Sequence, residues 1–251
     1  MTRTGVPTAR EMRGIVWRSH YLQAAWNTRS MQGVGFCYAL MPLLRRYAGD
    51  SERRTEFLKR HVGFFNTNPV FAGYVLGAVA AMEVSGADGA EIERVKKGMS
   101  SPLGMSGDAL IWGALRPFAG VLAVLLALAG AVWAPVVMLV AYGLPAVAMR
   151  ARGVAVGLRS GPNGAKEVLG VRVKGAVRIL RGAAAFGVGL VLAVGVRSGG
   201  NLEVWKVLAA AAFLVLAWAG TRARVPATVM GAAGAAIGLI LLAAGLNGGS
   251  M

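Results

Sequence analysis

The stretch Ser100–Pro117, SSPLGMSGDALIWGALRP, places polar and helix-breaking residues inside an apolar run. It contains two prolines, three glycines, Asp108 and Arg116. A charged side chain costs at least ~2.5 kcal/mol at the centre of a membrane helix, so such residues usually face a partner or a polar cavity. Backbone broken by Pro and Gly is tolerated at membrane depth only where protein or water satisfies its polar groups. The stretch therefore predicts a broken or re-entrant membrane segment with a functional role.

The same residues also fit a purely structural role. In that interpretation Asp108 caps a helix that begins at Ala109, and Arg116 extends its guanidinium to the lipid headgroups. Both interpretations place the stretch at the edge of a bilayer.

Composition identifies the class of protein. Of the 251 residues, 56% are hydrophobic and 36 are glycine, and the mean hydropathy of +0.57 is too high for an ordinary soluble domain. The net charge of +16 is interleaved with long apolar spans, which favours anionic lipid over nucleic acid as its partner. Cys37 is the only cysteine, so no intrachain disulfide or CxxC metal site is expected. The sequence indicates an integral membrane protein.

The N-terminal region is basic and amphipathic. Between Thr8 and Tyr47 apolar residues alternate with arginines, and no apolar run is long enough to cross a bilayer. Helices of this kind commonly lie in the headgroup plane or pack along other helices. Residues 50–60, DSERRTEFLKR, predict a charged helix exposed to solvent.

Residues 62–82 are apolar except for three polar residues, Asn66, Thr67 and Asn68, which Pro69 follows. Asparagine offers hydrogen-bond donors and an acceptor, and proline exposes backbone groups by breaking a helix. A simple helix cap by the asparagines is the alternative. In the same segment, the four-residue spacing of two glycines at positions 73 and 77 favours close helix packing.

The C-terminal half predicts several membrane passes. Residues 118–149 carry no charge and exceed the ~20 residues that one span needs, and Pro135 and Pro145 predict a break, so we expect two short or tilted passes. Eight Arg and Lys residues between Arg150 and Arg181 should hold the following loop in the cytoplasm. Further spans are expected at residues 182–196, 204–220 and 225–246, which would put the C-terminus outside.

These patterns define the expected fold. The chain should be an all-α integral membrane protein with N-terminal amphipathic helices, broken or re-entrant segments and about four to five transmembrane helices. Its regions would be 1–61, the basic N-terminal region; 62–117, the broken segments; and 118–251, the transmembrane region with a basic cytoplasmic loop at 150–181.

Two runs resemble a known family: FFNTNP at residues 64–69 and SPLGMSGDALIWGALRP at residues 101–117. Together they are similar to the signature pair of the IID component of mannose/fructose/sorbose-type phosphotransferase system (PTS) permeases. The N-terminal run RGIVWRSHYLQAAWNTRSMQGVGFCYALMPLLRR at residues 13–46 is similar to the family's N-terminal block. Other family-motif positions are Gln23, Trp26, Asn27, Gln32, Pro69, Gly107 and Pro117.

The resemblance implies a membrane subunit that, with a IIC subunit, binds and translocates a hexose-type sugar while the soluble IIA and IIB proteins supply its phosphorylation. It implies no phosphorylation site on this chain, so neither His20 nor His61 is expected to accept a phosphoryl group, and no cofactor or metal is expected. The protein would lie in the bacterial inner membrane, in an oligomeric complex, with its N-terminus cytoplasmic.

The resemblance also suggests a sugar path. Asn66, Asn68 and Asp108 would line it, because amide and carboxylate groups replace water around sugar hydroxyls. Trp112 would offer a stacking surface for a sugar ring, and Arg116 would pair with Asp108.

The alternative is a membrane scaffold or regulatory remnant of an incomplete PTS that no longer transports. Residues 201–218 lack the Met-Pro-Gly-Leu-x-Pro-like motif that family members carry before their last helices, which keeps this alternative open.

Overall fold

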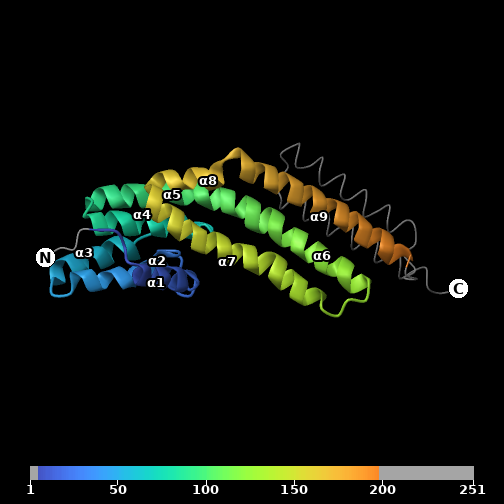
Figure 1. The fold of residues 1–251 in the computed structure, drawn as a ribbon, viewed down its shortest axis with the longest axis horizontal. Helices are drawn as coiled ribbons and strands as arrows, with labels where there is room; N and C mark the ends of the chain where they lie inside the picture. The colour runs from blue at the N-terminus through green and yellow to red at the C-terminus, as the bar shows by residue number, and fades with distance from the viewer. Residues whose placement is uncertain (1–4, 198–251) are drawn as a thin grey trace. The chain divides into compact units, whose positions relative to one another are not determined.

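The computed structural model describes residues 5–197, and in that range the regular elements are helices, with two isolated β-bridges. The described helices are α1 (Ala9–Ser19), α2 (Gly33–Leu44), η1 (Arg45–Tyr47), α3 (Ser51–Val62), α4 (Ala72–Ser85), α5 (Gly89–Gly107), η2 (Asp108–Leu115), α6 (Arg116–Leu128), α7 (Ala134–Ser160), η3 (Gly161–Ala165), α8 (Lys166–Leu169) and α9 (Val171–Arg197) (Figure 1). The chain divides into two compact units, Met1–Val191 and Leu192–Met251, and every contact discussed below lies in the first. The predicted helical fold is confirmed in these residues.

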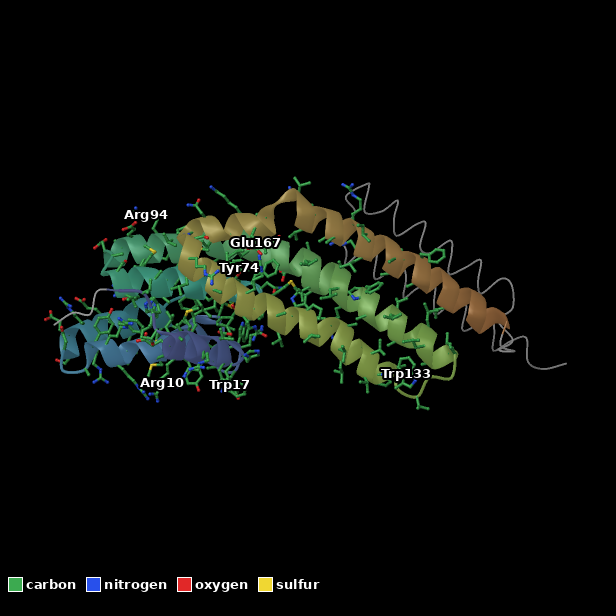
Figure 2. The ribbon with its side chains drawn as sticks, in the orientation of Figure 1. Arg10, Trp17, Tyr74, Arg94, Trp133 and Glu167 are labelled. Carbon is green, nitrogen blue, oxygen red and sulfur yellow. The ribbon has the colours of Figure 1, made fainter. Side chains whose placement is uncertain are left out.

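The N-terminal helices are capped and tied together by side chains. Thr8 accepts a hydrogen bond from the backbone of Glu11, whose carboxylate accepts one from the backbone of Thr8 in return. The same carboxylate pairs with Arg46 at 2.8 Å, and this hydrogen-bonded pair lowers the pKa of Glu11 to about 2. On the same helix α1, Trp17, labelled in Figure 2, keeps 66% of its surface exposed.

Helix α4 forms the centre of the core. Every residue from Ala72 to Ala80 is buried, including the large Tyr74. Phe36 and Leu40 of α2, Phe57 of α3 and Val154 of α7 belong to the same apolar cluster. A helix that is apolar all round is stable only where other elements cover all its faces.

Four glycines let α4 and α7 touch through their backbones. Gly73 and Gly77 on α4 lie against the α7 backbone at Val154. Gly153 and Gly157 on α7 lie against the α4 backbone at Tyr74. A methyl group at Gly157 would lie 2.9 Å from the backbone nitrogen of Ala78, which is closer than real Cβ atoms approach. The close packing expected from the two α4 glycines therefore has a matching pair on the partner helix.

The predicted break at Ser100–Pro117 is wrong. Helices α5, η2 and α6 run on as one helical stretch, Gly89–Leu128. Pro117 falls in the first turn of α6, directly after η2, which is a π-helix. The ring of a helical proline clashes with the carbonyl four residues earlier, and a wider turn makes room for it. Asp108 therefore lies inside a helix and does not cap one.

The chain leaves helical geometry instead between α3 and α4, at residues 63–71. Pro69 lies in this connection together with the polar residues Asn66, Thr67 and Asn68. The break expected from these residues is thus found where the asparagines are, and not in the stretch with two prolines.

Two helical stretches of the described residues, Gly89–Leu128 and Ala134–Gly189, are long and apolar enough to cross a membrane. The break within residues 118–149 falls at 129–133, just before Pro135, whereas Pro145 lies inside α7. At this turn Val132 is 93% exposed and Trp133, labelled in Figure 2, is 54% exposed.

The segment 150–181 is not the predicted loop, because most of it is helical. Arg150 lies inside α7 and donates a hydrogen bond to the backbone oxygen of Ser19. Arg152, also on α7, forms a salt bridge with Glu167 at 2.6 Å. These two arginines therefore have partners within the folded protein. The expected spans at 204–220 and 225–246, and the expected position of the C-terminus, lie outside the described residues.

The glycine contact makes a stability prediction. We expect Gly157→Ala to lower the free energy of unfolding by roughly 1–3 kcal/mol, as overpacking does in a tight interface. Gly143→Ala on the same helix is the control, because no atom lies within 4 Å of the added methyl group. The measurement is the thermal unfolding midpoint of both purified variants in detergent. Equal midpoints would contradict close packing between α4 and α7.

Candidate functional site

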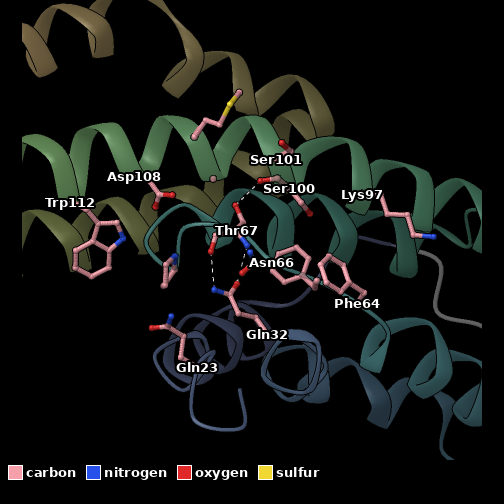
Figure 3. Close-up of a pocket in the computed structure, with 14 residues that line it drawn as sticks. Gln23, Gln32, Phe64, Asn66, Thr67, Lys97, Ser100, Ser101, Asp108 and Trp112 are labelled. Atoms are coloured by element: carbon pink, nitrogen blue, oxygen red, sulfur yellow. Dashed lines mark hydrogen bonds between the residues drawn. The ribbon is translucent and has the colours of Figure 1, made fainter. Parts of the chain in front are cut away.

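A polar cavity of about 550 Å³ lies where the 63–71 connection meets α5 and the α1–α2 loop (Figure 3). Three segments far apart in sequence contribute its wall. The lining residues are Gln23, Gln32, Phe64, Phe65, Asn66, Thr67, Pro69, Lys97, Ser100, Ser101, Gly104, Met105, Asp108 and Trp112.

The 63–71 connection is held in place by Gln32. Its side-chain Nε2 donates to the backbone oxygen of Thr67 at 2.8 Å, and the backbone N–H of Thr67 donates to its Oε1 at 3.1 Å (Figure 3). The backbone N–H of Gln32 also donates to Phe65 at 2.8 Å. Gln32 is only 2% exposed, so these hydrogen bonds form away from water. Its side-chain amide supplies the partners that the Thr67 backbone would otherwise find in a strand or helix.

Asn68 joins the 63–71 connection to η2. Its Nδ2 donates to Oδ1 of Asp108 at 2.9 Å, and its own Oδ1 accepts from the backbone N–H of Val70 at 3.0 Å. A side chain at Gly107 would collide with Asn68, so only glycine permits this approach. Asn68 thus lies behind the cavity wall and orients the Asp108 carboxylate, which is exposed to the cavity.

The predicted ion pair between Asp108 and Arg116 is wrong. Among the described residues no salt bridge joins them, and the Arg116 guanidinium lies 5.4 Å from the centre of the Trp112 ring. Arg116 comes eight residues after Asp108, too far along one helix for an i,i+4 contact. Neither Arg116 nor Pro117 lines the cavity.

The other predicted positions divide into two groups. Asn66 and Trp112 line the cavity as expected, and so do the motif residues Gln23, Gln32 and Pro69. Trp26 and Asn27 lie outside its wall, in the α1–α2 loop. There the side-chain oxygen of Asn27 accepts from the backbone of Arg29 at 3.0 Å and of Ser30 at 2.8 Å, which shapes a turn.

Sequence reasoning missed five lining residues on α5: Lys97, Ser100, Ser101, Gly104 and Met105. They precede Asp108 and Trp112 at intervals of three and four residues, which is the spacing of one helical face. This three- and four-residue spacing is present in the sequence, but it defines one face only if residues 97–112 form a continuous helix.

The wall combines amide, hydroxyl, carboxylate and ammonium groups with an exposed aromatic ring. Amides and hydroxyls both donate and accept hydrogen bonds, so together they suit a small ligand that carries many hydroxyl groups. In the described part of the chain no cluster of His, Cys, Asp and Glu could hold a metal ion.

A second polar cluster is buried away from the cavity. Glu83 accepts from His61 at 2.8 Å, from Arg60 at 2.9 Å and from Tyr47 at 3.1 Å. His61 is fully buried between the rings of Phe36 and Phe57 and its Nδ1 has no hydrogen-bond partner. This cluster joins η1, α3 and α4, and it gives His61 a structural role.

Burial lowers the pKa of His61 below its ordinary value of 6.5, and the nearby cations Arg60 and Lys96 act in the same direction, against the carboxylate of Glu83. The unfolded chain therefore takes up a proton before the folded one as the pH falls. We expect the thermal midpoint of the purified protein to drop between pH 7 and pH 5, and this drop to be smaller in His61→Gln. A pH slope that is identical in the two proteins would contradict this assignment.

The geometry first defines a class: a helical protein with two helical stretches long and apolar enough to cross a membrane, and with a cavity lined by polar side chains. Comparison with known proteins then identifies the family. The model of the PTS mannose/fructose/sorbose family IID component matches residues 7–198, and the chain belongs to this family. The family expected from the sequence motifs is therefore confirmed.

Individual relatives agree. The mannose-specific EIID component of Escherichia coli (strain K12) is 36% identical over 169 residues, 65% of this chain and 60% of the relative. The sorbose-specific EIID component of Klebsiella pneumoniae is 37% identical over 151 residues, 58% of this chain and 55% of the relative. The chain thus spans about three fifths or less of the length of these relatives.

Two solved structures are similar in fold. A cryoEM structure of the mannose transporter ManYZ in complex with microcin E492 matches with a TM-score of 0.59 and 32% identity, covering 73% of this chain and 69% of that one. A structure described as a membrane protein matches with a TM-score of 0.70 and 26% identity, covering 95% of this chain and 97% of that one.

The Gln32 contact makes a local prediction. Gln32→Met keeps the size of the side chain but removes both hydrogen bonds to Thr67, which leaves buried backbone groups unpaired at about 1–3 kcal/mol each. Hydrogen exchange of the backbone amides of residues 64–68 and 70 should accelerate. Gln23→Met is the control, because Gln23 lines the same cavity without a hydrogen bond to the connection. If both variants exchange at the wild-type rate, Gln32 does not hold the connection.

Proposed function

We propose that this chain is the IID membrane subunit of a PTS sugar permease, which with a IIC subunit binds and translocates a hexose-type sugar coupled to its phosphorylation by IIA and IIB. The observation that supports the proposal best is the cavity, because its polar wall is built from the FFNTNP and SGDALIW motif residues. The names of the relatives point to mannose, sorbose and fructose as the substrates to test.

The residues have distinct roles in this proposal. Asn66 and Asp108 contact sugar hydroxyls, and Trp112 stacks on the sugar ring. Asn68 orients the Asp108 carboxylate through its 2.9 Å hydrogen bond. Arg116 lies against Trp112 and steadies the indole ring from outside the cavity.

The chain contributes binding, and the phosphoryl transfer takes place on its partners. His61 is buried and bound to Glu83, which argues against a phosphoacceptor role. The subunit would work in the bacterial inner membrane in an oligomeric complex with IIC, surrounded by lipid, with its N-terminus in the cytoplasm and its C-terminus outside.

The test is sugar uptake by cells that express the chain with its IIC, IIA and IIB partners. Asp108→Asn keeps the size of the side chain but removes the charge, and hydrogen bonds to a charged group contribute about 1.5–3 kcal/mol. We therefore expect the apparent affinity for sugar to fall by roughly tenfold or more. Glu91→Gln, an exposed carboxylate on the same helix, is the control and should transport like wild type.

Two other outcomes are informative. Wild-type uptake by Asp108→Asn at wild-type complex levels would remove Asp108 from the sugar path. An assembled wild-type complex that takes up none of the three sugars would favour the non-transporting scaffold.

A further inference from the structure

The cavity residues Asp108 and Trp112 lie in a rare type of helical turn. Both belong to the π-helix η2, in which backbone hydrogen bonds span five residues instead of four. The N–H of Arg116, at the end of this turn, donates to the oxygen of Ile111. A π-helix is less favourable than an α-helix, so an uninterrupted run of eight residues needs support from outside the helix.

Pro117 removes one backbone donor from this turn. In the five-residue pattern of η2 the N–H of residue 117 would donate to the oxygen of Trp112, and in the four-residue pattern of α6 to the oxygen of Gly113. Proline has no N–H, so neither carbonyl receives a bond from this position. Arg181 of α9 supplies a donor to one of them: its Nε donates to the Gly113 oxygen at 3.0 Å. Gly113 is half-buried, and the donor from Arg181 gives its carbonyl a partner inside the protein, which stabilises the wide turn.

The absence of a side chain at Gly113 leaves room for the same contact. A methyl group there would lie 2.7 Å from Nη2 of Arg181, so a side chain would push the guanidinium away. Within the described residues Arg181 forms no salt bridge, and its side chain donates its hydrogen bond to the backbone oxygen of Gly113. The guanidinium therefore serves the backbone of η2 and not a carboxylate.

We infer that Arg181, although outside the cavity wall, is a positioning residue of the cavity: it holds the π-turn open and thereby fixes Trp112 relative to Asp108. Its link to sugar affinity rests on the proposed function. Its effect on the turn does not, and the two can be measured separately.

The first experiment reports on the turn without any sugar. The native Cys37 is only 4% exposed, so a thiol reagent labels it poorly. Trp112→Cys reports on η2, and Met105→Cys reports on the cavity wall before η2. In the assembled complex, adding Arg181→Met should change the labelling rate at position 112 and leave position 105 unchanged. Equal rates at position 112 with and without Arg181 would overturn the inference.

The second experiment measures uptake of mannose, fructose and sorbose by the complete complex. Arg181→Met should raise KM by about tenfold, because a displaced Trp112 loses its stacking contact with the sugar ring, with less change in maximal rate. Arg178→Met removes an exposed cation from the same helix and should behave like wild type. A KM for Arg181→Met within about twofold of that of Arg178→Met would overturn the role in affinity.

Two further variants keep the test decisive. Gly113→Ala displaces the guanidinium while Arg181 remains, so it should reproduce the labelling change of Arg181→Met. If Arg181→Met does not assemble, Arg181→Lys is judged by the same criteria, because lysine keeps the charge but not the planar donor group. Normal labelling in both variants would overturn the inference. Failure of uptake in the wild type would count against the proposed function alone.

Discussion

Backbone contact between α4 and α7 is the constraint on which the rest of the described structure depends. Apolar side chains give little net attraction between helices in lipid, because the surrounding tails are equally apolar. Glycine removes the side chain at the contact, so the two backbones can approach and gain dispersion contacts along their length. With α4 fixed in this way, the connection that precedes it is anchored at its C-terminal end. The cavity is built on that connection.

The cavity follows from how the backbone groups of the connection are satisfied. Thr67 receives both of its backbone partners from Gln32, and Asn68 hydrogen-bonds Asp108, which is exposed to the cavity. A non-helical segment in a membrane protein persists only with such internal partners. The polar residues of the FFNTNP motif are therefore divided between holding the connection in place and lining the cavity.

Sequence alone predicted the helical membrane class, the family and the importance of the two motif runs, because these depend on composition and on residue identity. It failed where tertiary contacts decide. The prolines at 102 and 117 suggested a break, but a π-turn and a donor from α9 keep that helix continuous. Arg116 was paired with the only nearby carboxylate in sequence, yet it lies against Trp112. Asn68 was assigned to the sugar path, although its burial makes it a support.

The exposed turn between α6 and α7 bears on the depth of the cavity in the bilayer. Trp side chains concentrate at membrane–water interfaces, and Trp133 keeps 54% of its surface exposed at this turn. The helix from Trp112 to Leu128 is about 24 Å long at 1.5 Å per residue. The hydrocarbon layer is ~30 Å thick. A helix of that length covers most of such a layer, so the cavity residue Trp112 and the exposed turn lie about one crossing apart.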